Sequence, residues 1–274
     1  MQTGAETTTR VAAVQLRSGP EKAENIARAG ELVAAAAERG ARIVVLPEKW
    51  TGMGDAEELR GFAEPLRAGP AYEAMRGWAA ELGVAVVGGS ITELLENGWL
   101  ANTSVAFEAG GEEAGVYRKL HMFDVEVGGR VYRESEAEEA GEEVVACELA
   151  GWRTGLSICY DLRFPELFRA LVDGGARLLV VPAAFTLATG RDHWEVLLRA
   201  RAIEDQCFVV AANQWGEPAG IPCFGRSMVV DPWGLVLAQA PDEDGIAVAD
   251  LDRARQDEVR AKLPALDHRR PELY

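Results

Sequence analysis

Residues 41–47 read ARIVVLP and residues 176–184 read ARLLVVPAA. Both are short, continuous apolar runs rich in Val, Leu and Ile, which is typical of a strand in a sheet covered on both faces. Around each run, we expect strands, helices and a hairpin to follow one another in a similar order. This repeated order predicts an α/β fold with two similar sheets that face each other and carry helices outside.

The remaining elements follow from apolar patterning and from Gly and Pro positions. In the first half we expect strands at 10–16 and 84–90, helices at 21–39 and 72–82, and a hairpin over 102–119. In the second half we expect hairpins over 143–159 and 227–239, strands at 207–214 and 245–251, and helices at 165–172, 193–206 and 252–262.

Length and composition limit the classes of function that are possible. The 274 residues suffice for one large α/β domain, predicted at 10–274, after a disordered lead-in at 1–9. A net charge of −16 argues against nucleic acid as a partner. No apolar run approaches the roughly 20 residues that cross a membrane, and the N-terminus lacks the pattern of a secretory signal.

The cysteines indicate a reducing compartment. Cys147, Cys159, Cys207 and Cys223 form no C-x-x-C pair, and no Cys/His cluster has zinc spacing. A cytoplasmic protein with reduced thiols and without a metal or other cofactor is the simplest interpretation. Cys147 and Cys207 lie in or beside apolar strands, where a buried free Cys is common, whereas Cys223 is expected in a loop.

Three unusual polar residues follow expected strands: Glu48 in IVVLPEKW, Lys119 in GVYRKLHMFD and Cys159 in TGLSICYD. Sites in covered α/β sheets collect at the carboxyl ends of strands. Each residue alone is as well explained by a solvated loop or by core filling. Together they could form a site in which the thiol attacks an acyl carbon, the carboxylate moves a proton and the ammonium faces the developing oxyanion.

Histidine is the usual base for a nucleophilic cysteine, so it is an alternative to Glu48. His121 lies two residues after Lys119 and is the serious candidate. His193 is expected to open a helix, and His268 lies away from any expected strand end.

The chain resembles the nitrilase superfamily of carbon–nitrogen hydrolases. The resemblance rests on LPEKW, YRKLHMFD, SICYDLRFPEL, RARAIEDQCFVVAANQ and DPWGLVLA, in that family's order and spacing over nearly the whole chain. It implies an αββα sandwich of two mixed sheets, with Glu48 as base, Lys119 as charge partner and Cys159 as nucleophile. A second glutamate is implied in the segment YRES, at Glu134, although the spacing from Lys119 is about one residue shorter than expected and ESEAEEAGEE offers other glutamates.

The resemblance also implies a reaction. Cys159 would attack an amide carbonyl, release ammonia and form a thioester that water hydrolyses, with the Tyr160 N–H helping to hold the oxyanion. Tyr160 stands where nitrile hydrolysers usually carry Trp. The chain is most similar to the Nit branch, which includes ω-amidases and deaminated-glutathione amidases. Arg163 matches a position that pairs with a substrate carboxylate, and its alternative is an ion pair with Asp161 or Glu166.

Other functions remain open on the sequence alone. The same three residues serve an N-carbamoyl amino-acid hydrolase, an aliphatic nitrilase is a further alternative, and a catalytically silent interaction module is a third. Phe123 and Phe185 could line the substrate pocket or belong to the core. The family resemblance implies a homodimer or higher homo-oligomer that forms through outer helices, including the helix at 193–206.

Overall fold

The computed structural model describes residues 8–273, so Tyr274 and most of the expected lead-in lie outside the described residues. The first strand, β1 (Thr8–Gln15), begins two residues before the expected domain start. Thr8 and Thr9 therefore belong to the sheet, where they pair with Asp252 and Leu251, and the expected lead-in over 1–9 was wrong for these two residues.

Two mixed sheets form the centre of the molecule, as predicted. The first contains, in spatial order, β17 (Gly245–Asp252), β1, β2 (Ile43–Val45), β3 (Ala85–Val87), β5 (Leu100–Phe107) and β4 (Ile91–Leu94), with β6 (Glu113–Arg118) also paired to β5. The second contains β16 (Val236–Gln239), β15 (Met228–Val230), β12 (Phe208–Asn213), β11 (Leu178–Ala183), β10 (Trp152–Leu156) and β9 (Ala146–Leu149). The last strand, β17, thus joins the sheet built by the first half of the chain.

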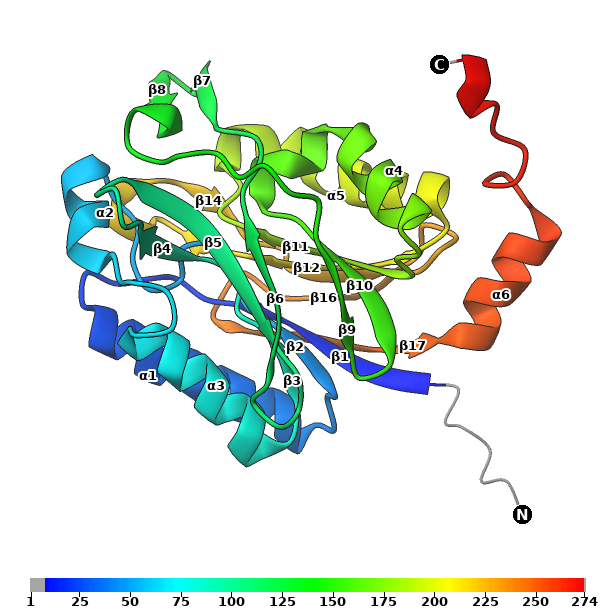
Figure 1. Cartoon of the computed structure of the whole chain (residues 1–274), viewed down its shortest axis with the longest axis horizontal. Coiled ribbons are helices and arrows are strands. Elements are labelled where there is room, and N and C mark those ends of the chain that lie inside the picture. Colours follow the sequence, from blue (N-terminus) through cyan, green and yellow to red (C-terminus); the bar gives the residue numbers. More distant parts are fainter. Residues whose placement is uncertain (1–7, 274) are drawn as a thin grey trace.

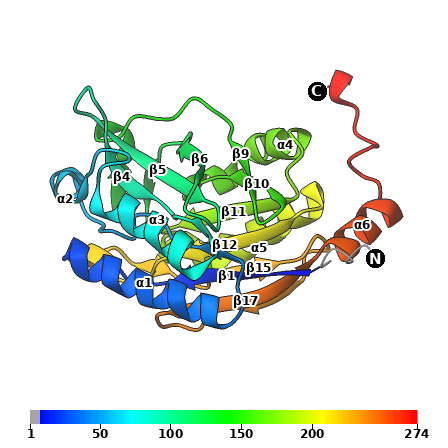
Figure 2. The same cartoon turned by 60° about the horizontal axis from the view of Figure 1, so that its bottom comes forward.

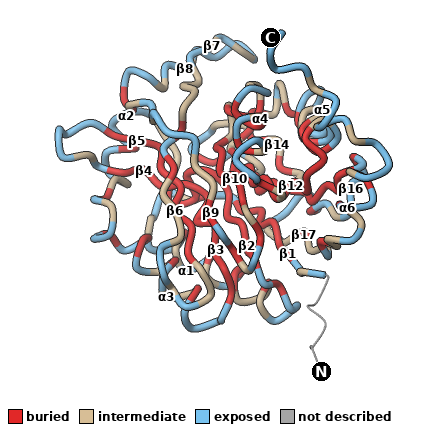
Figure 3. The backbone as a smooth tube through the Cα atoms, turned by 45° about the vertical axis from the view of Figure 1, so that its right-hand side comes forward, coloured by how far each residue is buried: buried red, intermediate tan, exposed pale blue. Residues whose placement is uncertain are grey.

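Helices cover the outer face of each sheet (Figures 1 and 2). They are α1 (Lys22–Glu38) and α3 (Pro70–Leu82) on the first sheet, and α4 (Pro165–Asp173) and α5 (Leu187–Asp205) on the second. Three apolar clusters fill the layers: one between the sheets, one under α1 and α3, and one under α4 and α5. Figure 3 shows that the buried residues are concentrated in the strands. The predicted α/β sandwich with outer helices is confirmed.

The structure corrects one helix boundary that bears on the site. The helix expected from His193 begins six residues earlier, at Leu187, and continues through Gly190. A Cβ built at Gly190 would lie 2.3 Å from the Cβ of Phe224, so glycine here permits close packing of α5 on β14 (Cys223–Phe224). Cys223, expected in a loop, lies in this short strand.

Several short elements were missing from the sequence prediction. α2 (Ala56–Phe62) begins with a capping box between Asp55 and Glu58. β7 (Asp124–Val127) and β8 (Arg130–Arg133) form a small separate hairpin, which continues into a 3₁₀ turn over Glu134–Glu136. The other missed elements are β13 (Trp215–Gly216) and the 3₁₀ turns at Pro218–Gly220 and Pro271–Leu273, whereas α6 (Arg253–Lys262) confirms the helix expected at 252–262.

Among residues 8–273, no helix is long and apolar enough to cross a membrane.

Candidate active site

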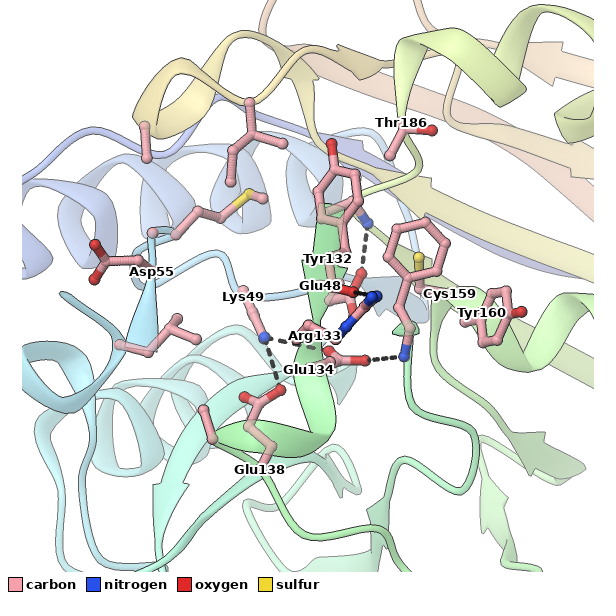
Figure 4. Close-up of a pocket in the computed structure, with 18 of the residues that line it drawn as sticks. Glu48, Lys49, Asp55, Tyr132, Arg133, Glu134, Glu138, Cys159, Tyr160 and Thr186 are labelled. Carbon is pink, nitrogen blue, oxygen red and sulfur yellow. Dashed lines mark hydrogen bonds and ion pairs between the residues drawn. The ribbon is translucent and has the colours of Figure 1, made fainter. Parts of the chain in front are cut away.

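Glu48, Lys119 and Cys159 line one cavity of about 750 Å³, although they follow three different strands. Figure 4 shows Glu48 and Cys159 in this cavity. Glu48 follows β2 and Lys119 follows β6, both in the first sheet, whereas Cys159 follows β10 in the second. Backbone hydrogen bonding ties the sheets together at this point, because the Glu48 N–H donates to the Ala183 carbonyl at the end of β11. The facing of the two sheets therefore assembles the site.

Lys119 is at the centre of a buried charge cluster. Its ammonium nitrogen lies 3.0 Å from Oε1 of Glu48 and 2.8 Å from Oε2 of Glu134. The Asn102 side chain donates to Oε1 of Glu48 at 2.8 Å, and the Ala184 N–H donates to Oε2 at 2.8 Å. Each Glu48 oxygen thus has fixed donors, which set the orientation of this carboxylate.

Glu134 is the glutamate of its acidic segment that reaches Lys119. Both its oxygens accept from the Lys119 ammonium, at 2.9 and 2.8 Å, and Oε2 also accepts from the Phe123 N–H at 2.8 Å. Burial opposes ionisation, but the ammonium groups of Lys119 and Lys49 outweigh it and hold the pKa of Glu134 below its usual range. Glu134 is therefore a carboxylate that orients Lys119.

Cys159 has an unusual backbone and a protonated side chain. Its φ is +48°, in the left-handed region that non-glycine residues seldom adopt, and it begins a 3₁₀ turn over Cys159–Arg163. Burial raises the pKa of the thiol well above its ordinary value, and so do the charge of Glu48 and a hydrogen bond to it. Lys119 and the Ala184 N–H oppose this shift. The raised pKa therefore favours the thiol form of Cys159, which lies beside the Glu48 side chain.

None of the three histidines is among the residues that line the cavity. The ring of His121 contacts Asp161 through Nδ1 at 2.7 Å and stacks on Phe164 with centroids 3.6 Å apart. Asp161 is itself buried and accepts from the Tyr117 hydroxyl at 2.6 Å. This arrangement turns His121 toward Asp161, and it does not line the cavity that Cys159 lines.

Arg163 lies in the cavity wall without a carboxylate partner among residues 8–273. Its guanidinium carbon lies 5.0 Å from the ring centroid of Phe185 and 5.9 Å from that of Tyr160. It also forms a hydrogen bond to Nδ1 of His193, at 3.2 Å. The ion pair with Asp161 or Glu166, weighed as the alternative, does not form.

The aromatic residues expected near the substrate also reach the cavity. Phe123, Tyr160 and Phe185 all line it. The Phe123 ring packs edge-on against Tyr160, with centroids 5.0 Å apart. Phe185 is buried and packs against Trp194, so it belongs both to the core and to the cavity wall.

Three polar residues of the cluster escaped the sequence analysis: Lys49, Asn102 and Glu138. Lys49 is 8% exposed, and its ammonium lies 2.9 Å from Oε2 of Glu138. Glu138 is 2% exposed, although Glu136, Glu142 and Glu143 of the same acidic segment are exposed. The position of Lys49 directly after Glu48 could have indicated that it belongs to the site. Nothing in the sequence distinguishes Glu138 from its acidic neighbours.

No group of three or more His, Cys, Asp and Glu side chains within residues 8–273 is arranged to hold a metal ion.

Comparison with known proteins identifies the class. A model of the carbon–nitrogen hydrolase family matches residues 10–261, and the chain belongs to this family. It is an enzyme that hydrolyses C–N bonds, of the amidase type.

The two amidase relatives named here are similar over nearly their whole length. A deaminated glutathione amidase of Synechocystis is 40% identical over 94% of this chain and 97% of its own. The human omega-amidase NIT2 is 37% identical over 98% of this chain and 97% of its own. Among solved structures, Saccharomyces cerevisiae Nit3 superposes with a TM-score of 0.87 at 29% identity, covering 98% of this chain and all of that one. The C. elegans NitFhit protein gives 0.89 at 35% identity, covering 97% of this chain and 66% of that one.

Proposed function

We propose that this enzyme hydrolyses a small amide that carries a carboxylate, through a thioester on Cys159, and releases ammonia. The observation that carries this proposal is one cavity in which Cys159 lies beside Glu48 and Lys119, and in whose wall Arg163 has no carboxylate partner. Cys159, Glu48 and Lys119 supply the reacting centre. Arg163 supplies a cationic group that can bind an anionic substrate.

In the first half of the reaction, Glu48 accepts the thiol proton as the sulfur of Cys159 bonds to the amide carbon. The carbonyl oxygen becomes an oxyanion, which the Lys119 ammonium and the Tyr160 N–H stabilise. The protonated Glu48 then gives its proton to the departing nitrogen, the C–N bond breaks, and ammonia leaves a thioester on Cys159.

In the second half, Glu48 removes a proton from water as the water oxygen bonds to the thioester carbon. The C–S bond breaks, the proton returns to the Cys159 sulfur, and a carboxylic acid is released. The sum is an amide plus water giving an acid plus ammonia. The raised pKa of the thiol supports this order, because the sulfur needs Glu48 before it can attack.

Arg163 supports a substrate with a carboxylate away from the reacting amide. A guanidinium binds a carboxylate through two parallel hydrogen bonds, and the side chain already lies on the faces of Tyr160 and Phe185. Deaminated glutathione and α-ketoglutaramate, the amide acted on by an ω-amidase, both meet this description.

The test is a substrate screen on the purified enzyme. We expect ammonia from α-ketoglutaramate or deaminated glutathione, and an acyl adduct on Cys159 that mass spectrometry detects after a rapid acid quench. Release of carbon dioxide together with ammonia from carbamoyl amino acids would indicate the ureido substrate instead, and turnover of simple nitriles alone would indicate a nitrilase. Hydrolysis without any adduct on Cys159 would contradict the thioester.

We also infer a cytoplasmic enzyme that assembles as a homodimer or a higher homo-oligomer. The four free thiols support the reducing compartment. On α5, Val196 and Ile203 are 64% and 49% exposed, which supports an outer helical contact, whereas Trp194 and Leu198 pack inward on the sheet. Light scattering after gel filtration measures the mass: twice 29.6 kDa or a higher multiple is expected, and a monomer would contradict the assembly.

A further inference from the structure

Lys49 provides a second buried ammonium beside the one that the proposed mechanism uses. Its Nζ lies 2.9 Å from Oε2 of Glu138 and 3.3 Å from Oε1 of Glu134. Figure 4 shows Lys49 between these two glutamates, with its side chain directed toward the acidic segment. The backbone contributes to this direction, because Lys49 has φ +47° and so turns away from the path of β2 after Glu48.

Glu138 is poorly satisfied without Lys49. Its Oε1 atom is buried without a hydrogen-bond partner within residues 8–273. Burial and the neighbouring Glu134 raise the pKa of Glu138, against the effect of Lys49. Burying an ionisable carboxyl without full hydrogen bonding costs free energy of folding. The position of Glu138 is therefore better explained by a role in the site than by a contribution to stability.

Glu134 lies between the two ammonium groups. Lys119 contacts both of its oxygens, whereas Lys49 contacts Oε1 alone. Asn102 also reaches Oε1, at 3.4 Å. The Lys49 contact therefore restrains the Glu134 carboxylate from the side opposite the Phe123 N–H, which donates to Oε2.

We propose that Lys49 and Glu138 are positioning residues that hold Glu134 in the orientation that directs Lys119 toward Glu48 and the reacting carbonyl. This inference rests on the proposed function, because it assigns a role within the same site. Glu138 holds the Lys49 ammonium at one end, Lys49 restrains Glu134, and Glu134 in turn holds Lys119. Neither Lys49 nor Glu138 touches the reacting atoms.

The test compares Lys49→Met with Lys49→Met/Glu138→Gln. Lys49→Met removes the cation that lowers the pKa of Glu138, so the buried carboxyl must take up a proton or ionise without a partner, and the variant is expected to lower both Tm and kcat. The fall in kcat is expected to be about 100-fold, the size of effect that misplacing a catalytic group by about 1 Å can have. The KM is expected to change little. The acidic limb of the kcat profile should move to higher pH, because Glu134 loses one of the ammonium groups that lower its pKa.

The double variant separates positioning from simple charge compensation. Glu138→Gln removes the titratable carboxyl, so Tm should recover, while kcat should remain low because nothing replaces the Lys49 contact to Glu134. Recovery of kcat together with Tm would overturn the proposal. A raised KM with unchanged kcat in Lys49→Met would overturn it as well, since Lys49 would then be binding substrate.

Lys22→Met is the matched control. Lys22 pairs with the buried Glu64 at 2.5 Å, and neither residue lines the cavity. This variant should lose stability and keep its kcat. A wild-type enzyme that released no ammonia from any carboxylated amide would contradict the proposed function, whereas a fully active Lys49→Met enzyme would contradict this inference alone.

Discussion

The ammonium of Lys119 lies 3.0 Å from Oε1 of Glu48, and neither side chain is more than 5% exposed. Buried ion pairs of this kind add little stability compared with well-packed apolar residues, because desolvation offsets their attraction. Their geometry here is instead suited to chemistry. The pair keeps a carboxylate beside the Cys159 thiol while its positive partner remains available to a developing oxyanion.

Replacing Glu48 tests the choice of base. Glu48→Gln keeps the shape of the side chain and removes its ability to accept a proton, so we expect kcat/KM to fall by about 10²–10⁴. His121→Ala should cost far less, because His121 contacts Asp161 rather than the thiol. The rate of acylation, measured by stopped flow in Glu48→Gln and in His121→Ala, distinguishes the two candidate bases. Abolished acylation in His121→Ala, with Glu48→Gln largely active, would establish a Cys–His pair instead.

Alkylation by iodoacetamide tests the state of Cys159. We expect one label per native chain, at Cys159, because the other three thiols are buried, whereas Cys159 is half-buried and lines the cavity. The labelling rate should increase with pH as the thiolate forms. Since the charge of Glu48 raises the pKa of this thiol, Glu48→Gln should move the midpoint of labelling to lower pH.

Peptide mapping by mass spectrometry identifies the labelled residue, and denatured protein, in which all four thiols should react, is the control. First labelling at a different cysteine, or an unchanged midpoint in Glu48→Gln, would contradict the arrangement described for Cys159.

Arg163 should determine substrate choice rather than the chemical step. Arg163→Met removes hydrogen bonds to a charged group, worth about 1.5–3 kcal/mol, so kcat/KM for a carboxylated amide should fall roughly 10- to 100-fold. Turnover of an uncharged amide of the same chain length should be nearly unchanged. Initial-rate kinetics on the two substrates provide the comparison, and equal losses on both would show that Arg163 does not bind the carboxylate.

Gly89 should be essential to the placement of Glu48. Its φ is +59°, and a Cβ built there would lie 2.0 Å from the Pro47 carbonyl oxygen, in the backbone just before Glu48. Gly89→Ala should therefore displace that backbone, destabilise the fold by about 1–3 kcal/mol beyond the cost of the left-handed conformation, and lower kcat.

Gly98→Ala is the control for this prediction. Gly98 also has positive φ, at +85°, but its Cβ would meet nothing within 4 Å. Thermal unfolding and ammonia release should separate the two variants, with Gly98→Ala showing a modest loss of Tm alone. Equal effects would show that conformational strain, rather than the contact with Pro47, explains the role of Gly89.

Much of the framework was predictable because it depends on local patterns. The apolar runs at 41–47 and 176–184 became β2 and β11, both fully buried. The beginning of α5 was not predictable, since Gly190 reads as a break in the sequence and is explained only by the approach of Phe224. The hairpin of β7 and β8 was missed although its sequence, DVEVGGRVYR, alternates on both sides of Gly128-Gly129, a pattern typical of a two-residue hairpin turn.

The sequence by itself determined the two layers of strands, their covering helices and the polar residues at three strand ends, since periodicity and chain order are local properties. Tertiary structure decided which side chains meet. Only the facing of the sheets brings Cys159 to Glu48, and only folding of the acidic segment separates the buried Glu138 from its exposed neighbour Glu136. Glu48 is 71 positions from Lys119 and 111 positions from Cys159 in the chain. Their contacts depend on the packing of both sheets, which no local sequence pattern specifies.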